Sequence, residues 1–231
     1  MVQPLTSAEM RSLENKVLET GSVTGLELME RAGQGVVDAI IHQWSDASTA
    51  PADVLVLCGP GNNGGDGFVV ARLMKALGHR VQALFYGKRE KLSQDAGRNY
   101  DLWRGQAENK LRQLGFPDLT TEDQSFIDSV YAEPSRLVVV DALFGIGLDR
   151  PLTALQPVLN AHARRRKSQP EPSTYCVAVD VASGISDDGP VSENTNSVLQ
   201  ADLTVTFHQI KKAHVAAPDF CGTVVAHDIG L

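Results

Sequence analysis

The 231-residue sequence has few cysteines and no long apolar stretch. Its three cysteines, Cys58, Cys176 and Cys221, form no CxxC pair, and an odd number of thiols cannot all pair within one chain. We therefore expect reduced cysteines, packed in or near the core, as in proteins of a reducing compartment. No run approaches the roughly 18 consecutive apolar residues of a transmembrane helix, so the sequence predicts no membrane-spanning segment.

The chain also lacks the short motifs of several enzyme classes. It contains no HExxH, no GxSxG and no Gly-Lys-Ser/Thr of a P-loop. No basic segment followed by an apolar one begins the chain, so we expect no signal peptide. The excess of 28 acidic over 21 basic residues argues against nucleic-acid binding, and the basic cluster at 164–167 fits a solvated helix end. From these absences we expect a cytoplasmic protein that contacts neither membrane nor nucleic acid.

Apolar runs alternate with helical segments from residue 53 onward. The runs typical of buried parallel strands are 54–58, 81–86, 137–140, 175–179 and 203–207, with 224–226 as a short sixth candidate. Helices are expected near 67–77, 91–114 and 155–165. This alternation predicts an α/β protein with a three-layer Rossmann-like fold and a mostly parallel central sheet. Because no repeat or linker interrupts it, residues 1–231 are interpreted as a single domain.

Two extra helices are predicted before the first strand. Thr6 with Glu9, and Thr24 with Glu27, have the spacing of capping boxes, in which a hydroxyl and a carboxylate satisfy free backbone N–H groups. In the second helix, apolar residues recur at intervals of three and four. Gly33 lies within that helix, so we expect another backbone to approach closely there.

A glycine-rich segment, GPGNNGGDG at residues 59–67, follows the first strand. It satisfies GxGxxG between a strand and a helix, where backbone N–H groups can approach a phosphate; a tight turn with packing glycines is the alternative. The acidic residue that a dehydrogenase carries after the second strand is missing, because that strand leads into Tyr-Gly-Lys-Arg at 86–89. The polar Asn62, Asn63 and Asp66 suggest sugar binding or cation coordination instead.

Two later strands each end in an aspartate followed by a loop that contains glycine. Asp141 and Asp180 hold these positions, and parallel strands bring their carboxyl ends to one edge of the sheet. A single aspartate there is often only a helix cap, but two of them facing GxGxxG favour a site. The oxygen donors Asn63, Asp141 and Ser183 favour a hard cation. His208 and His214 have no catalytic spacing and fit loop or interface positions better.

The motifs GPGNNGGDG, VVDALFGIGLDRP and AVDVASGI, in this order, resemble those of the NAD(P)H-hydrate epimerase family, also known as the YjeF N-terminal domain. The segment 28–33 is similar to the opening helix motif of that family, and ADLTVTFHQIKKAH to its last strand and lysine-containing loop. The resemblance covers roughly residues 6–231. It departs from the family at Arg31, which stands in place of Asn, and at Ala182, which stands in place of Pro.

The resemblance implies a site built from all three motifs. It implies one K⁺ per subunit, held by Asn63, Asp141 and Ser183. It implies that Asp180 is the catalytic residue. Lys88 is a second catalytic candidate, which matches a basic residue of the family more loosely. The implied substrate-binding residues are Asn62, Asn63, Gly64, Gly65, Asp66, Gly145, Ile146, Gly147, Leu148, Asp149, Arg150, Pro151 and Asp180.

The activity that the resemblance implies is interconversion of the R and S epimers of hydrated NADH and NADPH. The hydroxyl at C6 of the nicotinamide ring would leave with acid assistance and return to the other face, and we expect enclosure to raise the pKa of Asp180 for this task. The family also implies a homodimer and, in many bacteria, fusion to an ATP- or ADP-dependent dehydratase. A redox enzyme that uses intact NAD(P)H, or a non-catalytic nucleotide-binding or dimerisation module, are the alternatives; the intact motifs favour a working site.

Overall fold

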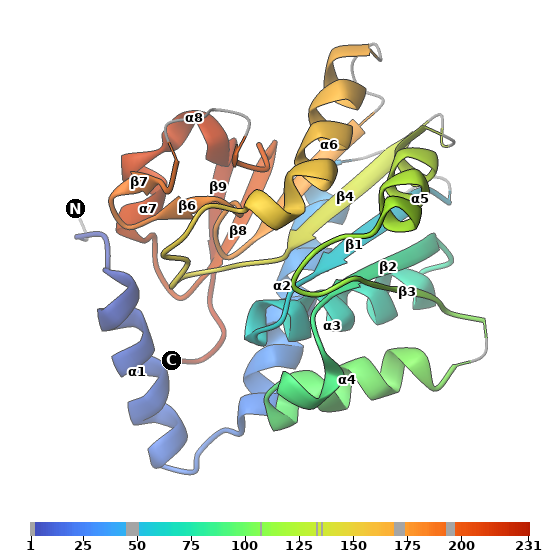
Figure 1. Ribbon diagram of the computed structural model, residues 1–231. Helices are drawn as coiled ribbons and strands as arrows, with labels where there is room; N and C mark the ends of the chain where they lie inside the picture. Colours follow the sequence, from blue (N-terminus) through green and yellow to red (C-terminus); the bar gives the residue numbers. More distant parts are fainter. Residues whose placement is uncertain are drawn as a thin grey trace.

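The computed structural model describes residues 3–44, 51–106, 108–132, 134, 136–168, 174–192 and 197–231. Within these residues one parallel sheet has the strand order β3-β2-β1-β4-β5-β8-β9, which confirms the α/β fold with a parallel central sheet (Figure 1). The strands are β1 (Asp53–Cys58), β2 (Arg80–Tyr86), β3 (Lys110–Leu114), β4 (Leu137–Ala142), β5 (Thr174–Val179), β8 (Leu203–Phe207) and β9 (Thr223–His227), and β6 (Ile185–Ser186) pairs with β7 (Gly189–Pro190) in a small hairpin. The helices are α1 (Ser7–Glu19), α2 (Gly25–Gln43), α3 (Asn62–Ala76), α4 (Gln94–Arg104), α5 (Thr121–Ala132), α6 (Gln156–Ser168), α7 (Lys212–Ala216) and α8 (Pro218–Cys221).

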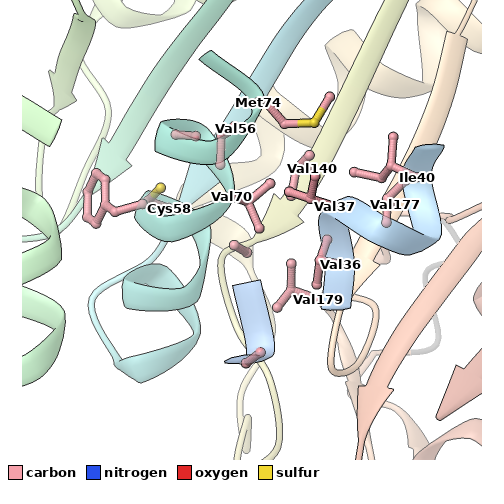
Figure 2. Close-up of a cluster of buried hydrophobic side chains, with 14 of the residues drawn as sticks. Val36, Val37, Ile40, Val56, Cys58, Val70, Met74, Val140, Val177 and Val179 are labelled. Atoms are coloured by element: carbon pink, nitrogen blue, oxygen red, sulfur yellow. The ribbon is translucent and has the colours of Figure 1, made fainter. Parts of the chain in front are cut away.

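Alternate side chains of each strand enter two separate cores, one on each face of the sheet. Val54, Val56 and Cys58 of β1 pack with α2, α3 and α4, whereas Leu55 and Leu57 pack with α5 and α6. Figure 2 shows the first core, where valines of β1, β4 and β5 meet side chains of α2 and α3. Burial on both faces explains why these strands are continuous apolar runs.

The two N-terminal helices begin as the sequence predicts. Thr6 and Thr24 each accept a hydrogen bond from the backbone three residues on, and Glu9 and Glu27 complete both capping boxes. Gly33 of α2 lies so close to α3 that an added Cβ would collide with the side chain of Val69. The expected close approach of another element is therefore confirmed.

The prediction of one long helix at residues 91–114 is wrong. The chain forms α4 and then β3, which pairs with β2 at the edge of the sheet. As an edge strand, β3 carries the half-buried Arg112 and the exposed Gln113 between its leucines and lacks a continuous apolar run. Two further differences concern helices: α5 was not expected, and α3 begins at Asn62 rather than near residue 67.

The basic cluster at the end of α6 is only partly a solvated helix end. Arg165 is buried and donates to the hydroxyl of Thr174 and to the carbonyl of Tyr131, and Arg166 forms a bidentate ion pair with Asp202. These contacts tie α6 to its neighbours. The three cysteines are free and buried, as predicted. No helix in the described ranges is long and apolar enough to cross a membrane.

The sheet order positions the candidate site. From β1 the chain moves outward to β2 and β3, and then returns to the other side of β1 to form β4. Ligands of open α/β sheets bind at such a reversal, outside the carboxyl ends of the strands. The segments after β1, β4, β5 and β8 therefore border one region at this edge.

Candidate functional site

A cavity of about 390 Å³ lies at this edge of the sheet, within the size range of small-molecule sites. It is formed by the segment after β1, the loop after β4, the end of β5 and helix α1. Most of the predicted binding residues line it, and the structure thus brings the three motifs together. The lining residues are Arg11, Glu14, Gly61, Asn62, Asn63, Asp66, Leu143, Phe144, Gly145, Ile146, Gly147, Leu148, Asp149, Arg150, Asp180 and Phe207.

The glycines after β1 allow elements to pack closely beside this cavity. A Cβ on Gly59 would collide with the carbonyl oxygen of Leu143, and one on Gly64 with the carbonyl oxygen of Gly59. A Cβ on Gly65 would meet the side chain of Met29 in α2, 2.6 Å from its sulfur. Of the predicted binding residues, Gly64, Gly65 and Pro151 are not among those that line the cavity. Gly64 and Gly65 serve close packing, Gly64 against Gly59 of the same segment and Gly65 against α2, whereas Gly59 lets the segment lie against the loop after β4.

Asp141 and Ser183 form a buried polar pair below the cavity. The Ser183 hydroxyl and backbone N–H donate to the two Asp141 carboxylate oxygens at 2.6 and 2.7 Å, and Leu143 N–H donates at 3.2 Å. Burial raises the pKa of Asp141 to about 6, although these hydrogen bonds lower it. Within the described ranges no cationic side chain pairs with Asp141. A buried carboxylate with only neutral donors, next to the hydroxyl oxygen of Ser183, fits a bound hard cation.

Asn63 links three parts of the site. With its amide oriented to satisfy both neighbours, its nitrogen donates to the Val179 carbonyl at 3.1 Å and its oxygen accepts from Gly145 N–H at 3.3 Å. One side chain on the first turn of α3 therefore fixes the end of β5 and the loop after β4. Gly145 leaves little room at this point, because a Cβ there would lie 3.1 Å from the side chains of Asn63 and Asp180 and would force them to shift.

Asp180 directly follows β5 and lies where the loops meet. Its backbone has a φ of 67°, a left-handed conformation unusual outside glycine, and its N–H donates to the Val205 carbonyl at 2.8 Å. The carboxylate oxygen Oδ1 accepts from Lys211 Nζ at 2.7 Å and from the Thr206 hydroxyl at 3.1 Å. Among the described residues, the other oxygen, Oδ2, accepts a single long hydrogen bond, from Ile146 N–H at 3.3 Å.

The expectation of a raised pKa for Asp180 is wrong. Burial is the largest effect and raises the pKa of this carboxyl, but the charge and hydrogen bond of Lys211, together with His214 and the Ile146 N–H, hold it below its ordinary value. Asp180 is therefore ionised at neutral pH. Asp66, which also lines the cavity, shows the opposite direction: burial raises its pKa well above the usual range, and the charges of Asp180 and Glu14 add to this effect.

Sequence reasoning missed three residues of the site. Lys211 follows β8, the next strand along the sheet, and the strand-end rule that selected Asp141 and Asp180 could have selected it too. Arg11 and Glu14 come from α1, and no signal in the sequence connects that helix with the cavity. Burial raises the pKa of Glu14, and Asp180 raises it further.

Two other candidate groups lie in different surroundings. Lys88 is exposed, directly before a short 3₁₀ turn at Arg89–Lys91, and it is not among the residues that line the cavity. His214 is buried and lies next to the site. Its Nε2 is 2.8 Å from the Asp180 carbonyl oxygen. Burial lowers its pKa, so its ring is neutral at neutral pH.

Comparison with known proteins gives consistent matches. A family model described as YjeF-related protein N-terminus matches residues 25–213. A "NAD(P)H-hydrate epimerase" of Roseobacter litoralis is 45% identical over 229 residues, which are 98% of each chain, and one of Rhodobacter capsulatus is 39% identical over 100% of each chain. A "Bifunctional NAD(P)H-hydrate repair enzyme Nnr" of Methanopyrus kandleri is 36% identical over 90% of this chain and 38% of its own length. The crystal structure of yeast ynu0 has the same fold, with a TM-score of 0.74 at 19% identity, over 98% of this chain and 88% of the yeast one.

Proposed function

Because this chain belongs to the YjeF-related protein N-terminus family, we propose that it interconverts the R and S epimers of hydrated NADH and NADPH, a reaction of nicotinamide nucleotide repair. Its similarity to proteins named NAD(P)H-hydrate epimerase, over essentially its whole length, supports this reaction. The observation that carries the proposal is the ionised Asp180, which presents one oxygen to a cavity that all three motifs border.

The reaction needs a proton donor, a proton acceptor and support for a cationic intermediate. The lone pair of the ring nitrogen forms a double bond to C6 while the C6–O bond breaks, and a donated proton lets the hydroxyl leave as water. The planar iminium that results carries a positive charge. Water then adds to the opposite face of C6, the C=N electrons return to nitrogen, and the added water loses a proton. One proton is donated and one recovered in each cycle, so no other reactant is consumed.

Two carboxyl groups of the cavity divide these tasks. Asp66 holds a proton to higher pH than an ordinary aspartate, so it is the donor to the leaving hydroxyl. Asp180 stays ionised, so its negative charge stabilises the planar cation. Two neighbouring carboxyls whose pKa values are pushed in opposite directions are a common arrangement for acid–base work. Lys88, which is exposed and outside the cavity lining, has no part in these steps.

Potassium belongs to the proposal, with one ion per subunit held by Asn63, Asp141 and Ser183. The support is the buried carboxylate of Asp141, with which no cationic side chain pairs in the described ranges, and the Ser183 hydroxyl beside it. When bound, the ion would supply positive charge that offsets Asp141 and favours one arrangement of the loops. The protein groups alone perform the proton transfers described above.

The proposal also includes an oligomeric state and a cellular location. The first is a homodimer that uses the N-terminal helices, where Leu18 of α1 has a partly exposed apolar side chain. The second is a cytoplasmic location, where hydrated nicotinamide nucleotides would be repaired. Sedimentation analysis of the purified chain tests the dimer.

The Methanopyrus relative, of which this chain matches 38%, is named bifunctional, which supports a functional link to a dehydratase.

A coupled assay tests the activity itself. The R epimer of hydrated NADPH is incubated with a separate dehydratase that consumes only the S epimer. Complete consumption when this protein is added, and none without it, is the expected result. Persistence of the R epimer would contradict the proposal. Incubation of NADPH with carbonyl substrates tests the redox alternative, which predicts a loss of the NADPH absorbance.

A further inference from the structure

Lys211 is one of the largest fully buried side chains of the described core, with 1% of its surface exposed, and it carries a charge. It follows β8 and is not among the residues that line the cavity. We propose that Lys211 is a positioning residue, which holds Asp180 in place so that only one of its carboxylate oxygens faces the substrate. The inference rests on the proposed function, because it concerns the group that supports the intermediate.

All three protons of the Lys211 ammonium have partners inside the protein. Nζ lies 2.7 Å from Asp180 Oδ1, 2.6 Å from the Thr206 hydroxyl and 3.0 Å from the Phe207 carbonyl oxygen. Since an ammonium has three N–H donors, none remains for a ligand in the cavity. Lys211 therefore acts through Asp180 and not on the substrate directly.

The backbone of Asp180 is held by the same segment that supplies Lys211. The Lys211 N–H donates to Nδ1 of His214 at 3.0 Å, which leaves Nε2 to carry the proton and donate to the Asp180 carbonyl at 2.8 Å. Asp180 is thus hydrogen-bonded at its side chain by the Lys211 ammonium and at its backbone carbonyl by the His214 imidazole. This second contact helps to hold a residue whose φ of 67° is otherwise unfavourable.

These contacts determine which carboxylate oxygen of Asp180 can contact the substrate. Oδ1 is occupied by Lys211 and Thr206, so the oxygen left for the substrate is Oδ2. The ammonium also balances a concentration of negative groups, because Glu14 of α1 and Asp66 of α3 face the same cavity. Without Lys211 the carboxylate could rotate and could gain a proton, and a neutral Asp180 would stabilise the cationic ring poorly.

A double-mutant cycle on the full chain tests this inference. The variants are Lys211→Met, Asp180→Asn and the two combined, with Lys212→Met as the matched control, since Lys212 is the adjacent lysine and is exposed. We expect Lys211→Met to lower kcat for epimerisation by roughly 10²-fold, with KM within about threefold of wild type. The combined variant should be no slower than Asp180→Asn alone, because Lys211 acts only through Asp180. Lys212→Met should match wild type.

Two results would overturn the inference. One is a normal kcat in folded Lys211→Met. The other is a combined variant whose loss equals the product of the two single losses, which would mean that Lys211 acts independently. Thermal unfolding of the same four variants separates this inference from the proposed function. Lys211→Met and Asp180→Asn each leave a buried charge unpaired and should lower Tm, whereas the combined change should recover part of the loss. If wild type does not epimerise, the function fails, and additive Tm losses would then overturn the pairing as well.

Discussion

Replacing Asp180 with Asn removes the negative charge from the site while keeping the size and shape of the side chain. If this charge supports the planar cation, kcat should fall by about 10²- to 10⁴-fold, which corresponds to about 3–5 kcal/mol of lost transition-state stabilisation. Binding of the substrate should change little, because the loops that line the cavity remain. KM should therefore stay within about threefold of wild type.

The same change also alters stability, because Lys211 loses the partner of its buried ion pair. Breaking a buried pair costs about 3–5 kcal/mol. At roughly 2–4 °C per kcal/mol for a chain of this size, Tm should fall by about 6–20 °C. The assay therefore has to be run well below the Tm of the variant.

The readout is epimerisation of the R form at saturating substrate, followed through an S-specific dehydratase. Asp188→Asn is the control, because it makes the same chemical change at an exposed aspartate in the loop after the same motif. A folded Asp180→Asn protein with a rate close to wild type would refute the role of this carboxylate.

Three further predictions concern the ion, the pH dependence and the packing of the site. Asn63→Ala should weaken the dependence of activity on K⁺; an unchanged K⁺ titration would count against the proposed ligand set. Burial lowers the pKa of His162 to about 4, so its contribution to stability is complete above its unfolded pKa near 6.5 and is lost as pH falls toward 4. That loss amounts to about 3 kcal/mol, and His162→Gln should flatten this part of the curve of unfolding free energy against pH. Gly59→Ala should destabilise the fold by about 1–3 kcal/mol and reduce activity, because the new Cβ would collide with the Leu143 carbonyl; denaturant unfolding of wild type and variant measures it.

The central strands were predictable because burial on both faces makes each of them a continuous apolar run. Strand β3 escaped prediction because it lies at the edge, where exposed polar side chains break the pattern. The true start of α3 at Asn62 was hidden by Gly64 and Gly65, which are poor helix formers on their own. Gly65 packs against α2 and α4, which are distant in the sequence, and a local pattern does not reveal such contacts.

In the site, too, the sequence predicted what local motifs encode and missed what depends on contacts between residues far apart in the chain. The three motifs were visible because each follows a strand, and the fold brings their residues to one cavity. The ionisation of Asp180 was mispredicted because its partner Lys211 comes 31 residues later, from another strand end. Enclosure alone would have raised the pKa; the neighbouring cation reverses the direction. The part of the site contributed by α1 has no sequence signature, because it depends on how that helix packs.

The most direct test of the account is isotope incorporation during epimerisation in H₂¹⁸O. If the C6 hydroxyl leaves as water and solvent adds to the opposite face, each molecule converted by wild type should carry one ¹⁸O at C6, as measured by mass spectrometry. Asp180→Asn should incorporate label at no more than about one hundredth of that rate. Conversion of the R to the S epimer by wild type without incorporation of ¹⁸O would contradict the account.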